Sequence, residues 1–206
     1  MSPLIRLALA ASLAAAALPA AAQSHGDWTV ALGAHRVDPT SANGRLAGGA
    51  LAVDVGADAR PTVMAEYFVR DGLGIELLAS LPLEHDIAVA GLGNVGSTRH
   101  LPPTLSLQYH FNHAGAVSPF VGAGVNYTTF FEEETRGALA GSRLTLDDSW
   151  GAALHAGVDV RIGERGAIRI DARWIDIDTD VSLDGAGLGT VAIDPLAYGA
   201  AYVWRF

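Results

Sequence analysis

The stretch that decides the fold runs from Val191 to Phe206 and reads VAIDPLAYGAAYVWRF. Side chains along a β-strand alternate between its two faces. One face of this segment carries Tyr198, Ala200, Tyr202, Trp204 and Phe206. Aromatic side chains at the ends of lipid-facing strands are typical of membrane-spanning β-barrels. The pattern therefore predicts a barrel strand on which these aromatic residues face lipid and Arg205 points inward.

Seven other segments alternate in the same way, and Leu101 to Phe111 shows the pattern most clearly. There Leu105, Leu107, Tyr109 and Phe111 oppose Thr104, Ser106, Gln108 and His110. A period of two residues predicts strands with one apolar and one polar face. In chain order the eight predicted strands are Trp28 to Val37, Thr62 to Arg70, Leu73 to Glu84, Leu101 to Phe111, Pro119 to Thr129, Ser149 to Val160, Ile168 to Trp174 and Val191 to Phe206.

The connections between these segments distinguish a barrel from a soluble sandwich, because alternation alone fits both. Long connections, such as Asp38 to Pro61 and His85 to Arg99, alternate along the chain with short ones such as Asp71-Gly72. Outer-membrane barrels have short periplasmic turns, long external loops and an even number of strands. The sequence therefore predicts an all-β protein, an eight-stranded antiparallel transmembrane β-barrel.

The first 22 residues have the features of a signal peptide. Arg6 supplies a positive charge, Leu7 to Leu18 form a short apolar core, and Ala20-Ala21-Ala22 fits a cleavage site for small residues. We therefore expect residues 1–22 to be removed and residues 23–206 to form the barrel domain in the cell outer membrane of a Gram-negative bacterium. A last strand that ends in Phe206 also resembles the signal that the outer-membrane assembly machinery reads.

Composition excludes several classes of protein. A formal net charge of −9, with no basic stripe, argues against a nucleic-acid partner. Cysteine is absent, so neither disulfides nor thiolate chemistry is available. No apolar run of membrane-spanning length follows the signal peptide, so any membrane span must be made of strands.

Candidate catalytic and metal-binding patterns are weak. Ser149 and His155 share a strand face, but six residues along a strand separate them by about 20 Å. The alternate aspartates from Asp176 to Asp180 resemble the start of a calcium loop, but Val181 and Gly187 occupy the positions that need Gly and Glu. We expect no catalytic residues, no metal and no cofactor. The aspartates are interpreted as a solvated strand end, with divalent-cation bridging to lipopolysaccharide as the alternative.

Several motifs resemble the OmpW family of outer-membrane proteins. The longest runs from Pro119 to Phe131 and reads PFVGAGVNYTTFF. The others follow in family order: Leu101 to Leu105, Asp148 to Gly151, Ala156 to Asp159, Asp176 to Thr179 and Ile193 to Pro195. The resemblance implies an eight-stranded barrel without catalytic residues. It also implies a narrow passive channel for small hydrophobic molecules, with entry from outside and lateral exit through the barrel wall.

Inward parity on the predicted strands selects the candidate lumen residues. The apolar ones, predicted to line a substrate path, are Met64, Phe68, Leu78, Ile175 and Ile177. The charged ones, predicted to form a cluster, are Glu66, Arg70, Glu76, Arg169, Asp171, Arg173 and Arg205. Charges in a narrow lumen must be paired or hydrogen-bonded. Arg173 departs from the family pattern, in which an aromatic residue precedes the position of Trp174.

Two functions remain open at this point. The first is the hydrophobic channel, whose partners would be outer-membrane lipid, lipopolysaccharide and small hydrophobic solutes. The second is a non-transporting surface barrel whose external loops bind a partner or support envelope integrity. In the second case the charge cluster would plug the lumen and stabilise the lower barrel.

Overall fold

The computed structural model describes residues 23–40 and 43–206. The predicted signal peptide, residues 1–22, lies outside the described residues. Within the described ranges, no helix is long and apolar enough to cross a membrane.

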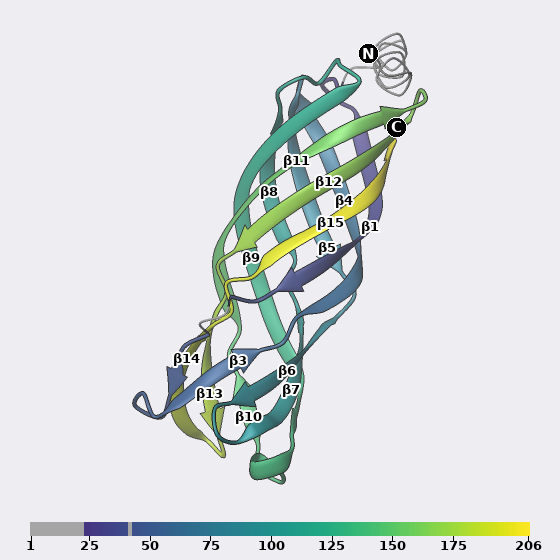
Figure 1. Cartoon of the computed structure of the whole chain (residues 1–206). Coiled ribbons are helices and arrows are strands. Elements are labelled where there is room, and N and C mark those ends of the chain that lie inside the picture. The colour runs from purple at the N-terminus through teal and green to yellow at the C-terminus, as the bar shows by residue number, and fades with distance from the viewer. Residues whose placement is uncertain (1–22, 41–42) are drawn as a thin grey trace, which may run out of the picture.

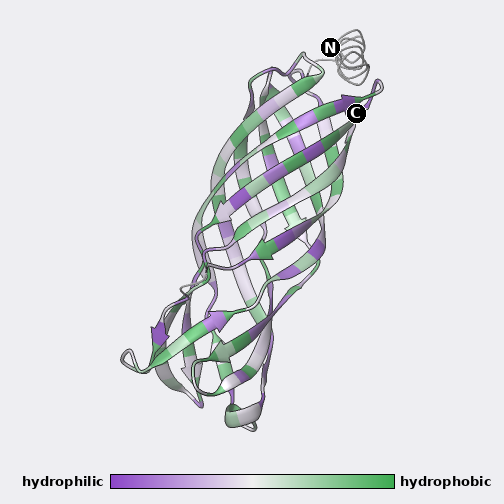
Figure 2. Ribbon diagram, viewed as in Figure 1, coloured by the Kyte–Doolittle hydropathy of each residue, from purple (hydrophilic) through white to green (hydrophobic). Residues whose placement is uncertain are grey.

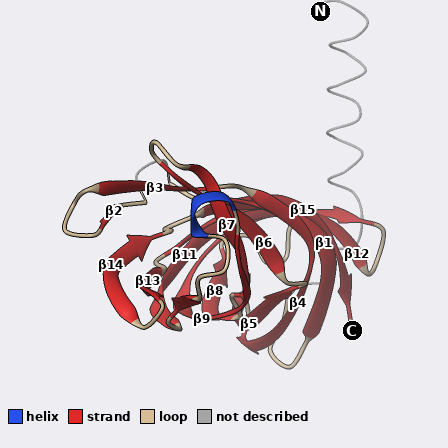
Figure 3. Ribbon diagram, turned by 90° about the horizontal axis from the view of Figure 1, so that it is seen from below, coloured by secondary structure: helices blue, strands red, loops and turns tan. Residues whose placement is uncertain are grey.

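Eight antiparallel strands close into a barrel, which confirms the predicted fold class (Figure 1, Figure 3). They follow the order β11-β12-β15-β1-β4-β5-β8-β9, and β9 pairs with β11 to close the ring. Short turns such as Asp71-Gly72 join them at the end of the barrel where the C-terminus lies (Figure 1). The barrel strands are β1 (Trp28–Asp38), β4 (Asp58–Arg70), β5 (Leu73–Ser80), β8 (Thr104–His110), β9 (Val117–Thr135), β11 (Ser149–Ile162), β12 (Gly166–Ile175) and β15 (Leu196–Arg205).

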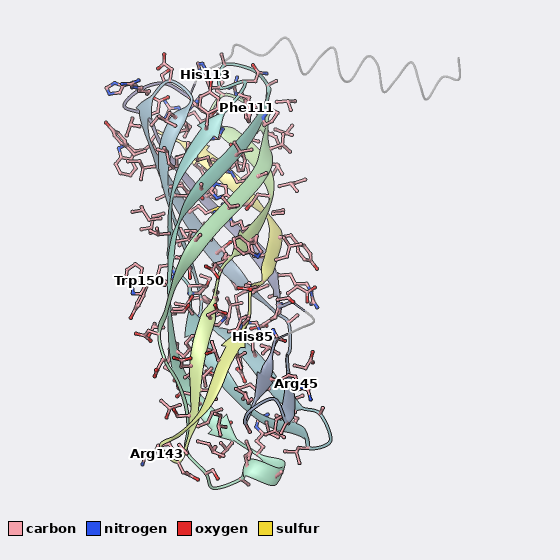
Figure 4. The ribbon with its side chains drawn as sticks, turned by 90° about the vertical axis from the view of Figure 1, so that its left-hand side faces the viewer. Arg45, His85, Phe111, His113, Arg143 and Trp150 are labelled. Carbon is pink, nitrogen blue, oxygen red and sulfur yellow. The ribbon has the colours of Figure 1, made fainter. Side chains whose placement is uncertain are left out.

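The outer face of the barrel is apolar. Along its strands hydrophobic and hydrophilic residues alternate, as predicted (Figure 2). The exposed residues include Leu32, Leu77, Leu107, Val125, Leu154 and Ile170. Aromatic residues flank this band, with Phe111 near the end that carries the short turns and Trp150 well along the wall (Figure 4). An exposed apolar band of this kind is unfavourable in water and matches the lipid-facing surface of membrane barrels.

The long connections at the opposite end fold into further strands, so they are not irregular loops. One group, β2-β3-β6-β7, continues the barrel wall from β9, and a second sheet has the order β10-β13-β14. We call these two groups, together with the 3₁₀ turn η1 (Gly137–Leu139), the extension (Figure 1). Its strands are β2 (Arg45–Leu46), β3 (Leu51–Val55), β6 (Leu83–Val89), β7 (Gly93–Leu101), β10 (Leu144–Leu146), β13 (Asp178–Leu183) and β14 (Ala186–Ala192).

Two predicted strands are each broken in the structure. The segment Leu73 to Glu84 divides at Leu81-Pro82 into β5 and β6, and Val191 to Phe206 divides before Pro195 into β14 and β15. The reason is the same in both cases. Proline has no N–H to donate to a neighbouring strand, so a ladder ends or bends where it occurs.

Candidate functional site

An apolar cavity of about 150 Å³ lies in the extension, between its two sheets. All the side chains that line it are apolar except His85 and Thr98. The buried lining residues include Leu46, Val53, Phe130, Leu144, Val191 and Ile193. A cavity of this size and lining stays dry and can hold a benzene-sized apolar molecule. Leu92 and Leu139 also line it and are partly exposed, so its rim is apolar as well.

The apolar lining continues from this cavity toward the barrel. Ile175 and Ile177 pack in the same buried cluster as Phe130 and Ile193. Ile175 also lines a second, smaller cavity of about 20 Å³ at the mouth of the barrel, together with Leu78 and other residues. The lining of the smaller cavity is mixed, because it also includes His35, Thr62 and Arg173. The apolar lining therefore ends at the level of Arg173.

From that level toward the short turns, two arginines form the centre of a buried network that we call the plug. Arg169 Nη1 lies 2.5 Å from Glu76 Oε2, and its Nε lies 2.8 Å from Asp159 Oδ1. Arg173 Nη1 lies 2.7 Å from Glu76 Oε1, and its Nε lies 2.7 Å from Asp171 Oδ2. All five side chains are at most 5 % exposed. Each carboxylate is thus paired, which is what burial of these charges requires.

Histidine and glutamine side chains extend the plug across the lumen. His110 Nε2 lies 3.1 Å from Glu66 Oε1, and Gln108 donates to Glu66 Oε2 at 3.0 Å. His155 Nε2 lies 2.8 Å from Gln108 Oε1, and His35 Nε2 lies 3.1 Å from Asp171 Oδ1. These side chains are fully or almost fully buried. The lumen at this height is filled by hydrogen-bonded polar groups, so it offers no axial path to an apolar molecule.

The structure divides the predicted apolar path between two places. Ile175 and Ile177 lie in the apolar cluster on the extension side, and Leu78 lines the smaller cavity, where it also packs against Met64, its partner on β4. Met64 and Phe68 lie within the plug: Arg173 Nη2 donates to Met64 Sδ at 3.4 Å, and the Phe68 ring is 5.4 Å from that of His110. Parity along a strand gives the face of a side chain, whereas its height among the other strands depends on strand stagger.

The predicted charge cluster is also divided. Glu66, Glu76, Arg169, Asp171 and Arg173 meet in the plug.

Arg70 and Arg205 do not belong to the plug. The Arg70 side chain is exposed, because a β-bulge between Phe68 and Arg70 reverses the alternation. Arg205 lies at the end of the barrel near the short turns, where its Nε is 3.5 Å from Asp27 Oδ2. Sequence reasoning missed Asp159 and Gln108 as members of the plug, although their positions on inward-facing parity were a signal for both.

Two imidazoles, His85 and His100, meet edge to face in the extension, outside the apolar band. His85 Nε2 is 2.9 Å from His100 Nε2, and the His100 ring stacks on Phe130. Burial, together with the neighbouring His85, lowers the pKa of His100 to about 3, and burial also lowers the pKa of His85. Asp58 and Arg60 on β4 face the pair with opposite charges. The pair is therefore built to remain neutral.

We expect acid to loosen the extension before the barrel. The pKa of His100 lies below its ordinary value of 6.5, so the unfolded segment binds protons more readily than the folded one. The stability that this histidine contributes is complete above pH 6.5 and is lost as the pH falls toward 3. Hydrogen exchange between pH 7 and pH 4 should show faster opening of β6 and β7 than of β11. His100→Asn should weaken this pH dependence, and an unchanged dependence would contradict the assignment.

One interruption breaks the barrel wall beside the smaller cavity. β5 pairs with β8 as far as Leu78 opposite Thr104, and β6 pairs with β7 only from Leu83 opposite His100. Among the described residues, no backbone hydrogen bond joins residues 79–82 to residues 101–103. Pro82, Pro102 and Pro103 supply no N–H at this place. The wall therefore lacks backbone hydrogen bonds between neighbouring strands at the place where the apolar lining meets the plug.

The OmpW family model matches residues 24–206. The chain belongs to the OmpW family. Outer membrane protein W of Escherichia coli (strain K12) is 34% identical over 210 residues, which cover 98% of this chain and 99% of the relative. The crystal structure of OprG from Pseudomonas aeruginosa superimposes with a TM-score of 0.79 at 32% identity, covering 90% of this chain and 99% of that one.

A third relative is more distant. The dibenzothiophene metabolism operon protein PahQ of Pseudomonas aeruginosa is 29% identical over 119 residues, which cover 56% of this chain and 55% of the relative.

These relationships and the fold place the OmpW-family chain in the cell outer membrane. Its apolar band therefore contacts lipid. Since barrels of this membrane carry short turns on the periplasmic side, the extension faces outside.

Proposed function

We propose that this protein is a narrow passive channel for small hydrophobic molecules, which enter from outside and leave laterally through the barrel wall. The observation that carries this proposal is the apolar cavity in the extension, which the plug closes off from the short-turn end of the barrel. An apolar molecule gains free energy on leaving water for such a cavity, at roughly 25 cal/mol per Å² of buried apolar surface. It gains nothing by entering the charged plug.

The exit follows from the place where the apolar lining ends. Leu78, Leu83 and Pro102 line the smaller cavity and lie at or beside the interruption between β5–β6 and β7–β8. A solute at this level meets the plug on its way toward the short turns. Beside it, only a stretch of wall without backbone hydrogen bonds between the strands separates it from lipid. We assign Leu78, Ile175 and Ile177 to the path, and the charged residues of the plug to the closure of the barrel.

The partners that this function requires are few. Small hydrophobic solutes use the path, and outer-membrane lipid and lipopolysaccharide surround the apolar band. The name of the relative PahQ refers to the metabolism of dibenzothiophene, an apolar compound, which is in keeping with this class of solute. The aromatic residues of β15 and the terminal Phe206 form the surface that we propose for recognition by the assembly machinery.

The test uses vesicles whose outer leaflet is lipopolysaccharide, which slows the passage of apolar molecules. A small apolar dye that fluoresces in lipid should reach the inner leaflet faster when the mature protein is present. A polar analogue of the same size should gain no such acceleration, because the cavity offers it no hydrogen-bond partners. Equal rates with and without protein would favour the non-transporting surface barrel.

A further inference from the structure

Asn126 on β9 is completely buried and lies inside the barrel next to the interrupted wall. It pairs with Thr104 on β8, the residue at which the β5–β8 ladder stops. Its Nδ2 donates to the carbonyl oxygens of Pro102 at 3.0 Å and Pro103 at 3.2 Å. Its Oδ1 accepts a hydrogen bond from Thr128 Oγ1 at 2.7 Å, which orients the amide. A buried amide with this many partners is held in one orientation.

The position of Pro102 explains what this contact does. Leu81 N–H donates to Pro61 O on β4, so by the alternation of a β-ladder the N–H of Ser80 points to the other side, toward β8. Extending the register from Leu78 opposite Thr104 by two residues places Pro102 opposite Ser80. In an ordinary ladder the Pro102 carbonyl would accept from Ser80. Here that carbonyl accepts from Asn126 Nδ2 at 3.0 Å and from Thr104 Oγ1 at 3.2 Å.

Both halves of this ladder step are therefore removed. Proline removes the donor on the β8 side, and Asn126 engages the acceptor. We propose that Asn126 is the positioning residue of the lateral exit. By holding the Pro102 carbonyl away from Ser80, it prevents the backbone hydrogen bond that would close the wall there. This inference rests on the proposed function for its purpose, whereas the contact that it describes can be tested separately.

The test compares the mature protein with Asn126→Leu, which has a similar volume but no amide. In this variant the Pro102 carbonyl loses the amide donor and keeps the Thr104 hydroxyl, so it should accept a hydrogen bond from Ser80 N–H in place of the one from Asn126 and close the step. Hydrogen exchange of the Ser80 amide should then slow by about fivefold to tenfold, the effect of one added hydrogen bond. Transfer of the apolar dye into the inner leaflet should fall in the same variant.

A second substitution, Ser80→Pro, distinguishes this role from a merely structural one. It removes the N–H that would close the step, so the double variant Asn126→Leu with Ser80→Pro should recover dye transfer. Ser80→Pro alone should keep the wild-type rate, because the wild-type protein does not use that N–H. The matched control is Ser106→Ala, a buried polar residue on β8 whose Oγ has no partner among the described residues, and it should change neither readout.

The outcomes separate the two proposals. Unchanged exchange at Ser80 in Asn126→Leu would overturn the positioning role, and so would a double variant that fails to recover transfer. Loss of transfer in Ser80→Pro alone would overturn it as well. If the wild-type protein transfers no more dye than empty vesicles, the channel function fails, and the exchange of Ser80 still decides whether Asn126 positions Pro102.

Discussion

Replacing Arg169 by leucine should lower the free energy of unfolding by about 3–5 kcal/mol, the cost of leaving buried charges without their partner. Arg169 contacts Glu76, Asp159 and, at 3.5 Å, Glu66, and its guanidinium lies 4.5 Å from the centre of the Phe120 ring. After the substitution, Arg173 is the remaining arginine in the plug, and it is already bound to Asp171 as well as Glu76. Urea unfolding in lipid vesicles, followed by tryptophan fluorescence, measures the change.

The matched control for this experiment is Arg165→Leu. Arg165 is exposed in the short turn between β11 and β12, so its loss should change stability by no more than about 0.5 kcal/mol. Equal effects of the two substitutions would show that the plug contributes no stability of its own. A large effect of Arg169→Leu alone identifies the plug as the polar core that stabilises the part of the barrel near the short turns.

Placing a charge in the extension cavity should abolish the transfer of apolar solutes. Val191 on β14 is 3 % exposed and lines the cavity, so in Val191→Arg the guanidinium either occupies the cavity or forces its walls apart. Either result removes the apolar surface on which a solute would bind. The dye-transfer rate of this variant should match that of empty vesicles.

Thr190→Arg is the control for this variant, because it adds the same side chain to the same strand. Thr190 is exposed, so the added charge lies in water and transfer should keep its wild-type rate. If Val191→Arg transfers dye as fast as Thr190→Arg, the cavity is not on the path. If the wild-type protein and both variants transfer dye no faster than empty vesicles do, the chain is not a channel for this solute.

The barrel itself could be predicted because its signals are local. Alternation in segments such as Ile168 to Trp174 reports which side chains share a face, and that relation depends on nothing beyond the strand. It predicts inward faces for Glu76, Arg169 and Arg173, and all three side chains are buried in the structure. It failed for Arg70 because the bulge at Phe68 reverses the faces, and neither of these residues signals a bulge.

The extension could not be predicted, because its connections contain short strands whose partners lie far away in the chain. β10 and β13, for example, pair across more than thirty residues, with Leu144 opposite Leu183. The prolines at 82 and 195 could have signalled the strand breaks, since proline rarely continues a ladder. The apolar residues of the connections looked like loop residues because no period of two ran long enough to be recognised.

By itself the sequence determined the class of fold, the number of barrel strands and the outer-membrane location. These properties follow from the two-residue period and from the lipid that one face must meet. Only the tertiary structure decided the heights of the inward side chains, since strand stagger brings Arg169 to Glu76 across 93 residues. It also decided where the apolar lining ends. The cavity and the plug arise from contacts between distant strands, which no local pattern encodes, and only the register of β5 against β8 shows that the prolines of the two segments meet.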